Sequence, residues 1–158
     1  MKLAAASPEE MRALGARLAV AIRAADPSEP LLIGLSGDLG AGKTTLVGGL
    51  LAALGHDGAV RSPTYTLIEP YRLASRDLYH CDLYRLRDPA ELDDLGLRDL
   101  AAARSVLLVE WPERAADRLG RLDLALRLHY ANEGRTIEVE AGSEPGRRVS
   151  AALGLDRV

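Results

Sequence analysis

The sequence is poor in cysteine, in lysine and in long apolar runs, and these shortages limit the classes of protein to which it can belong. Cys81 is the only cysteine among 158 residues, which excludes an internal disulfide and fits a reducing compartment, so we expect a cytoplasmic protein. No stretch approaches the length of a transmembrane helix, so no membrane partner is expected. The formal net charge of −3 argues against a surface that coats DNA or RNA.

The bulk composition is that of one globular domain. Hydrophobic residues make up 47% and charged residues 27%, and 158 residues are enough for a sizeable core. We therefore treat residues 1–158 as a single domain, with 141–158 as a C-terminal tail that ends in a marginal helix or frays. The apolar start resembles a signal peptide only as far as Ser7-Pro8-Glu9-Glu10, which interrupts it too early.

Lysine is nearly absent, yet one of the two lysines stands in a phosphate-binding motif. Residues 37–44 read Gly-Asp-Leu-Gly-Ala-Gly-Lys-Thr, a complete Walker A loop. Its glycines let the backbone bend so that successive N–H groups point at phosphate oxygens. Lys43 would reach the β- and γ-phosphates, and the Thr44 hydroxyl would bind Mg²⁺. We expect the nucleotide to be bound by Gly37, Gly40, Ala41, Gly42, Lys43, Thr44 and Thr45.

The surroundings of this loop fit a nucleotide site. An apolar strand is predicted over 31–36 and a helix over 45–54, with Gly55 as its stop. The positive end of that helix dipole adds to the attraction for phosphate. The sequence has no Asn-Lys-x-Asp guanine motif, and Asp93–Gly96 matches a GTPase motif in letters alone, because no apolar strand precedes it. A specificity for GTP is therefore not expected.

Two carboxylates are candidates for holding the metal and the attacking water. Glu110 closes the apolar run Ser105–Val109 in the Walker B arrangement, which would bring its carboxylate to the ligand-bearing edge of a parallel sheet. The simpler interpretation is an ordinary polar residue at a strand end. Asp82 lies in an apolar and aromatic segment, where Asp is disfavoured. It is either a second magnesium or catalytic carboxylate or a structural hydrogen-bonding residue.

Several neighbouring positions leave their role open. Ser62, Thr64 and Thr66 form a hydroxyl-rich loop, where P-loop switch proteins contact the γ-phosphate and Mg²⁺, although an ordinary turn fits equally. A lone histidine beside an aromatic residue is more often packed and hydrogen-bonded than catalytic, so His80 is interpreted as structural. Trp111 is interpreted as core or partner surface, close to the nucleotide because it follows Glu110.

The rest of the pattern predicts helices and strands in alternation. A capping box at Ser7–Glu10 opens an amphipathic helix, and another at Asp88–Glu91 opens a helix towards Gly96. A further helical stretch covers 97–103. Strands are predicted over 64–71, 78–84, 105–109, 122–130 and 136–140, the last two joined as a hairpin.

Four blocks together resemble the TsaE family, the bacterial ATPases of tRNA threonylcarbamoyladenosine biosynthesis. They stand in the family's order and spacing, at residues 37–45, 62–67, 80–86 and 110–113. The Walker A loop is shared with many families, whereas Ser-Pro-Thr-Tyr-Thr, His-x-Asp-Leu-Tyr-Arg and Glu-Trp-Pro are specific in combination. The resemblance runs from about Leu14 to Arg135, nearly the whole chain.

This resemblance implies a P-loop NTPase-like three-layer α/β fold, with a mixed, mostly parallel sheet flanked by helices. It implies ATP hydrolysis with Mg²⁺ held by Thr44 and Glu110, and it matches Asp82 to the family's essential aspartate. Lys43, Asp82 and Glu110 would then be the catalytic residues, and residues 62–66 would be a switch-like loop. Arg135 would contact the nucleotide, and the turn at residues 7–10 would lie near the adenine.

The resemblance also implies partners. The family supports modification of the adenosine next to the anticodon in tRNAs that read codons starting with A. It does so by docking on a TsaB–TsaD pair, so tRNA would be met through that complex. Two alternatives stay open: a small-molecule P-loop kinase, and a nucleotide-sensing assembly module with little hydrolysis. The strand pair predicted between residues 64 and 84 argues against the helical lid of a kinase.

Overall fold

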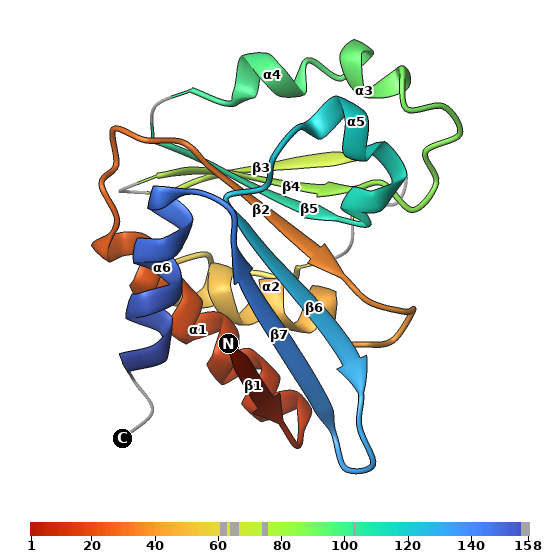
Figure 1. Cartoon of the computed structure of the whole chain (residues 1–158). Helices are drawn as coiled ribbons and strands as arrows, with labels where there is room; N and C mark the ends of the chain where they lie inside the picture. The colour runs from red at the N-terminus through yellow and green to blue at the C-terminus, as the bar shows by residue number, and fades with distance from the viewer. Residues whose placement is uncertain (61–62, 64–66, 74–75, 103, 156–158) are drawn as a thin grey trace.

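The chain folds around one seven-stranded sheet with helices on both faces, which confirms the expected three-layer α/β architecture (Figure 1). The computed structural model describes residues 1–60, 63, 67–73, 76–102 and 104–155. The strand order is β1-β7-β6-β2-β5-β4-β3. The strands are β1 (Lys2–Ala5), β2 (Leu31–Ser36), β3 (Ile68–Arg72), β4 (Asp77–Asp82), β5 (Ser105–Glu110), β6 (Leu124–Tyr130) and β7 (Arg135–Ala141).

Parallel pairing is confined to the centre of the sheet. β6, β2, β5 and β4 run parallel to one another, whereas β1 and β7 on one side and β3 on the other are antiparallel to their neighbours. All six residues of β5 are buried, as its continuous apolar run predicts. Because the parallel strands end at one edge of the sheet, that edge gathers Ser36, Asp82 and Glu110.

Two layers of helices cover the sheet. α1 (Pro8–Ala24), α2 (Lys43–Ala53) and α6 (Glu144–Leu155) pack on one face (Figure 1). The other face carries short elements: α3 (Glu91–Asp94), α4 (Leu97–Leu100), the 3₁₀ turn η1 (Pro112–Ala115) and α5 (Ala116–Leu119). Among the described residues no helix combines the length and the apolar character needed to cross a membrane.

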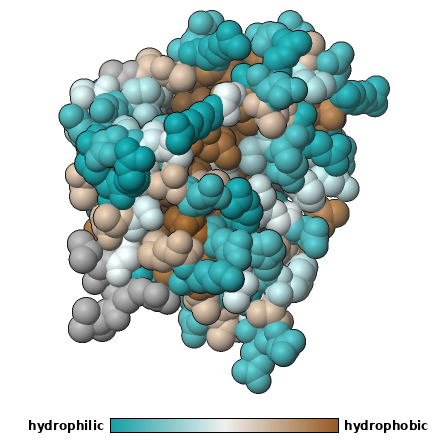
Figure 2. Space-filling model, viewed as in Figure 1, coloured by the Kyte–Doolittle hydropathy of each residue, from teal (hydrophilic) through white to brown (hydrophobic). Residues whose placement is uncertain are grey.

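The short helices cover their face incompletely. In the upper half of Figure 2, apolar surface lies at the bottom of hollows between hydrophilic side chains. On this side of the sheet Leu92, Leu97, Leu107 and Leu119 line a pocket of about 170 Å³. Deeper in the same layer lies Cys81, which is fully buried; burial raises the pKa of its thiol to about 12.

α1 and α2 approach so closely that two positions at their crossing admit no side chain. A Cβ atom at Gly15 would lie 2.1 Å from the Leu46 carbonyl oxygen, and one at Gly49 would lie 2.1 Å from that of Arg12. The adjacent Gly48, by contrast, faces open space. The two glycines therefore set the distance at which the helix after the phosphate loop is held.

The predicted caps and turns are largely confirmed. The hydroxyl of Ser7 accepts a hydrogen bond from the Glu10 N–H at 3.2 Å, so the capping residue of α1 is the predicted one. The predicted hairpin is β6–β7, closed by a bond from the Ala131 N–H to the Gly134 carbonyl. The strand pair after the phosphate-loop helix is β3–β4, although residues 64–66 of its predicted first strand lie outside the described part of the chain.

Four elements differ from the sequence prediction. The edge strand β1 was missed, because four residues show too little alternation to stand out beside the following helix. α6 is a twelve-residue helix with Val149 and Leu153 buried, not a marginal or frayed tail. α3 and α4 are single turns shorter than predicted: α3 begins only at Glu91, and α4 ends at Leu100 because Ala101 leaves the helical backbone with ψ +59°.

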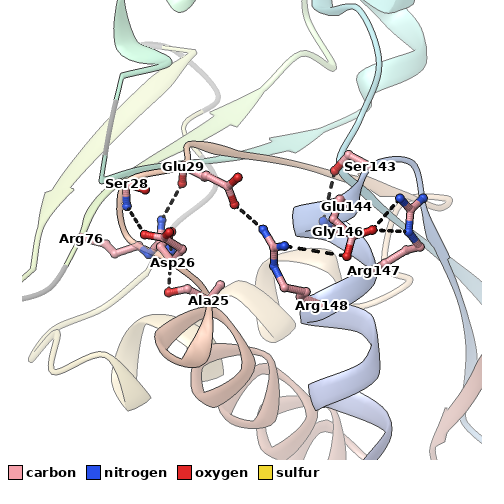
Figure 3. A network of polar contacts seen from close by, with 10 residues as sticks. All are labelled: Ala25, Asp26, Ser28, Glu29, Arg76, Ser143, Glu144, Gly146, Arg147 and Arg148. Atoms are coloured by element: carbon pink, nitrogen blue, oxygen red, sulfur yellow. Dashed lines mark hydrogen bonds and ion pairs between the residues drawn. The ribbon is translucent and has the colours of Figure 1, made fainter.

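A buried arginine ties several elements together at the opposite edge of the sheet (Figure 3). Arg76, only 2% exposed, donates to the carbonyls of Ala25, Asp26 and Glu29 at 3.2, 2.8 and 3.0 Å. Burial lowers the pKa of its guanidinium, and the nearby acidic side chains oppose that effect. Arg148 of α6 forms an ion pair with the Glu29 carboxylate, so the network joins α1, β4 and α6.

Candidate nucleotide site

The Walker A residues form the loop between β2 and α2, as the sequence predicts. Gly42 is the N-cap of α2 with φ +107°, and Gly40 has φ +78°, backbone values that favour glycine. A Cβ atom at Gly40 would also come within 2.9 Å of the Tyr130 hydroxyl. The loop therefore needs these glycines, and it delivers the chain to a helix amino terminus, where unpaired N–H groups attract anions.

Lys43 is the first residue of α2 and is 5% exposed. Its ammonium donates to the carbonyls of Gly37 and Asp38, the latter at 3.1 Å, and lies 4.4 Å from the ring centroid of Trp111. Burial lowers the pKa of Lys43 below its ordinary value, while the charge of Glu110 and then that of Asp82 work against this shift. The lysine therefore sits at the phosphate loop with acidic groups close by.

Asp82 and Glu110 end neighbouring strands and are paired in register across β4 and β5. Their side chains share the sheet face that packs on α1 and α2, because Leu78 and Leu108 lie at even spacing from them and belong to that core. Both carboxylates are buried, at 6% and 2% exposed, and Asp82 accepts a hydrogen bond from the Tyr84 N–H at 2.9 Å. Residues 28 positions apart thus meet.

One cleft brings the phosphate loop and the two carboxylates together. It has a volume of about 340 Å³ and is lined by residues 39–45, Asp82, Tyr84, Arg85, Glu110 and Trp111. No three His, Cys, Asp or Glu side chains of the described residues cluster as a self-sufficient metal site. Mg²⁺ needs no such cluster, since it commonly uses one or two carboxylates beside phosphates and waters. The Thr44 hydroxyl, Asp82 and Glu110 offer the oxygen donors that it prefers.

A second pocket, of about 140 Å³, adjoins the loop on its other side. Gly40–Gly42, Thr45, Gly134 and Arg135 line it together with Met11 and residues 5–8. The turn that opens α1 is thus close to the loop, where the family resemblance expects the adenine. Arg135 donates to the Gly40 carbonyl at 3.2 Å, and its guanidinium lies 4.0 Å from the ring centroid of Tyr130. Thr44 and Thr45 both belong to the main cleft.

The hairpin β6–β7 supports the loop from the same side. The Tyr130 hydroxyl donates to the Leu39 carbonyl at 2.8 Å, while Arg135 bonds to that of Gly40. Sequence analysis picked out Arg135 by family resemblance and gave Tyr130 no role. A residue in the last position of a strand carries no local signal that it will reach a loop 91 positions away in the chain.

Two further residues lie near the carboxylates: Trp111 lines the cleft, and His80 lies beside Glu110. The His80 ring nitrogen Nε2 lies 2.6 Å from a Glu110 carboxylate oxygen, in full burial. The signal was present: the two-residue alternation along 78–82 places His80 on the face of Asp82. Trp111 adopts the left-handed φ of +58°, rare for a bulky residue, and its ring lies 5.1 Å from that of Tyr84.

The switch-like segment cannot be placed. Ser62, Thr64 and Thr66 lie outside the described residues. Their neighbour Leu67 is described: its carbonyl accepts from the Asp82 N–H at 3.0 Å. Leu67 therefore lies beside the backbone of Asp82.

Comparison with known proteins identifies relatives over most of the chain. The family model described as threonylcarbamoyl adenosine biosynthesis protein TsaE matches residues 5–137. The chain is 40% identical to the tRNA threonylcarbamoyladenosine biosynthesis protein TsaE of Haemophilus influenzae over 148 residues, covering 92% of this chain and 94% of the relative. It is 38% identical to the protein of the same description from Bacillus subtilis over 133 residues, covering 84% and 80%.

A solved structure is similar as well. The crystal structure of Bacillus subtilis YdiB superposes with a TM-score of 0.79 at 29% identity, covering 98% of this chain and 94% of that one. The similarity therefore extends over the whole sheet and both helical layers.

Proposed function

Since the chain belongs to the TsaE family, we propose that it is a Mg²⁺-dependent ATPase of tRNA threonylcarbamoyladenosine biosynthesis. In this proposal it docks on a TsaB–TsaD pair and supports modification of the adenosine next to the anticodon in tRNAs reading codons that start with A. It meets tRNA through that pair, and it works in the cytoplasm. The names of its relatives support the pathway.

The observation that carries the proposal for ATP hydrolysis is the shared cleft. A phosphate loop alone would bind a nucleotide, whereas hydrolysis also needs groups that hold the metal and orient water. Here Lys43 and Thr44 line the same cleft as Asp82 and Glu110. The parallel register of β4 and β5 brings the two carboxylates there from separate parts of the chain.

The proposed mechanism is in-line attack of water on the γ-phosphorus, with cleavage of the bond to the ADP oxygen. Lys43 and the N–H groups at the start of α2 stabilise the charge that develops on the phosphate oxygens. Thr44 and Glu110 would hold Mg²⁺, which would supply Lewis-acid polarisation of the phosphates. Asp82 orients the attacking water or the water around the metal.

The two alternatives from the sequence differ from this proposal in measurable ways. A small-molecule kinase would need an acceptor site and an arginine-bearing lid, whereas here the segment after α2 continues into the β3–β4 hairpin. A sensing module would bind ATP and partners with little turnover. The presence of buried carboxylates at the cleft favours hydrolysis over sensing.

The test is ATP turnover by the purified chain, alone and with a TsaB–TsaD pair and tRNA. We expect turnover to rise with the pair, and Asp82→Ala and Lys43→Ala to lower it at least about 100-fold, as loss of a transition-state contact does. Asp77→Ala, at the opposite end of the same strand, is the matched control and should retain turnover.

Circular dichroism should show that all three variants are folded. Turnover that ignores the pair, in a chain that does not bind it, would refute the partner assignment. Unchanged turnover in Asp82→Ala would refute the role of that carboxylate. ATP binding without turnover under every condition would favour the sensing module.

A further inference from the structure

His80 does not line the cleft but lies behind it, in contact with Glu110. It lies in β4 between Leu78 and Asp82, and its side chain is 0% exposed. Its register partner on β5 is Leu108, two residues before Glu110. The ring therefore points along the sheet face towards the carboxylate that ends β5, and Nε2 lies 2.6 Å from the Glu110 oxygen Oε2.

The hydrogen bond fixes which ring nitrogen carries the proton. An ionised carboxylate can only accept, so Nε2–H donates to Glu110. The other ring nitrogen, Nδ1, has no hydrogen-bond partner across the described part of the chain. An apolar side chain at this position would avoid burying an unpaired nitrogen. The ring is thus a costly choice for packing alone, and its one polar contact is with Glu110.

From this geometry we infer that His80 is a positioning residue, which holds the Glu110 carboxylate in the orientation that Mg²⁺ of the bound nucleotide requires. The inference rests on the proposed function of Glu110 as a magnesium ligand. The bond engages Oε2 and so fixes the plane in which Oε1 lies. A carboxylate ligand oriented by a hydrogen bond to a second residue needs no reordering when the metal arrives. His80 does this without reaching the reacting atoms.

A role in packing and a role in positioning predict different rankings of variants. His80→Gln places an amide N–H near the position of Nε2, whereas His80→Asn places it near Nδ1, too short to reach Glu110. His80→Leu fills the space without a donor. If His80 positions Glu110, His80→Gln should resemble the wild type and the other two should be impaired. If His80 only packs, His80→Leu should do at least as well as His80→Gln.

The measurement is Mg²⁺ binding read by Trp111, the only tryptophan of the chain, which follows Glu110 and contacts Lys43. The protein is saturated with a non-hydrolysable ATP analogue and titrated with Mg²⁺ while fluorescence is recorded. For His80→Leu and His80→Asn we expect the half-saturating Mg²⁺ concentration to rise at least about tenfold. His80→Gln should stay close to wild type.

The matched control is Cys81→Ala. It removes a fully buried side chain from the adjacent position on the opposite sheet face, so it reports the effect of disturbing β4 alone. Its half-saturating Mg²⁺ concentration should equal that of wild type. Melting temperatures of all variants separate a loss of folding from a loss of Mg²⁺ affinity.

Several results would overturn the inference. One is a wild-type Mg²⁺ response in His80→Leu or His80→Asn. Another is an equal loss in His80→Gln and His80→Asn while both are folded, which keeps the test decisive if His80→Leu does not fold. A wild-type protein that shows no Mg²⁺ response with the analogue would instead refute the proposed function itself.

Discussion

Lys43 meets two opposing requirements. In the proposed function its ammonium must be charged to stabilise phosphate, yet burial favours the neutral amine and lowers its pKa. Glu110 and Asp82 supply the compensating negative charge, in that order of effect. The two carboxylates therefore raise the pKa of the lysine as well as offering ligands to the proposed metal. A substitution of either carboxylate should change both the pKa of Lys43 and the binding of the metal.

The pKa of Lys43 leads to a prediction about pH and stability. Because its pKa in the folded protein is below the ordinary 10.5, the unfolded chain binds more protons between these two values. The contribution of this group to stability is thus smaller at neutral pH and grows as the pH rises through that window. The free energy of unfolding of the wild type minus that of Lys43→Met should increase from neutral pH towards pH 10.5.

Urea unfolding of both proteins across that range measures the difference. A difference that stays flat or falls would mean that the folded protein does not depress this pKa. Nucleotide is left out of these samples, since its phosphates would add charge beside the ammonium.

At the residue scale, the sequence predicted which side chains form the candidate site but not which residues hold them in place. The spacing of the Walker A loop and the apolar run before Glu110 identify chemistry that is local in the chain, and the structure places Lys43, Thr44, Asp82 and Glu110 in one cleft. The bond between His80 and Glu110 depends on the register of β4 against β5, which no local pattern encodes. The expectation of a packed and hydrogen-bonded histidine is therefore correct in kind, but it could not identify Glu110 as the partner.

Among the elements, the crossing of α1 and α2 offers a matched pair of substitutions. Gly49→Ala would put Cβ 2.1 Å from the Arg12 carbonyl oxygen, so α1 and α2 must separate. We expect Gly49→Ala to destabilise the protein by about 1–3 kcal/mol, as overpacking does. Among the described residues, a Cβ at Gly48 meets nothing within 4 Å, so Gly48→Ala should be neutral or stabilise the helix by about 0.5–1 kcal/mol.

The free energy of unfolding in urea checks both substitutions. Equal effects at the two positions would show that intrinsic helix propensity, and not the close approach of α1, governs this part of α2.

The hairpin β6–β7 is expected to act on nucleotide affinity through Tyr130. Tyr130→Phe keeps the ring beneath the Arg135 guanidinium but removes the hydrogen bond to the Leu39 carbonyl. The phosphate loop should then be less firmly held, and the dissociation constant for the ATP analogue should rise roughly two- to tenfold. Calorimetric titration measures it, with Tyr79→Phe on the opposite sheet face as control. An unchanged constant would show that the loop is held without this bond.

At the scale of elements, prediction succeeded where periodicity was long and failed where it was short or terminal. α1 and β5 follow from sustained patterns of apolar residues. β1 has only four residues and is defined by its pairing with β7, far away in sequence. The helical spacing of Val149 and Leu153 is present in the sequence, but α6 is stabilised by packing these residues on α1, and the sequence does not show that contact.

For the whole molecule, the Arg76 network should contribute stability and leave chemistry untouched. Arg76→Met retains an apolar stem but leaves the carbonyls of Ala25, Asp26 and Glu29 without their donor. We expect a loss of about 1–3 kcal/mol in the free energy of unfolding. Arg72→Met, whose side chain is 80% exposed and whose ion pair spans 3.8 Å, should cost at most about 0.5 kcal/mol.

Thermal or urea unfolding tests the stability of both variants, and the KM for ATP tests the separation from function. A raised KM in folded Arg76→Met would mean that the far edge of the sheet is coupled to the nucleotide cleft.

The overall architecture could be predicted in class but not in full topology. Alternating strands and helices, with a buried apolar strand at 105–109, predict a parallel sheet between helical layers. The parallel pairings are the central ones, while both edges are antiparallel. The short edge strands are defined by their backbone pairing with a neighbouring strand, and no local sequence pattern specifies that pairing.

The buried Cys81 thiol can report local opening of the layer formed by the short helices. Thiolate is the reactive form of cysteine, and a thiol with a pKa of about 12, sealed between β4 and the short helices, is nearly silent towards alkylating reagents. A reagent can therefore label Cys81 only when the short helices move away from β4. Because the chain has one thiol, the labelling rate measures the frequency of this local opening directly. A slower rate with ATP would show that nucleotide binding also stabilises the layer on the other face of the sheet.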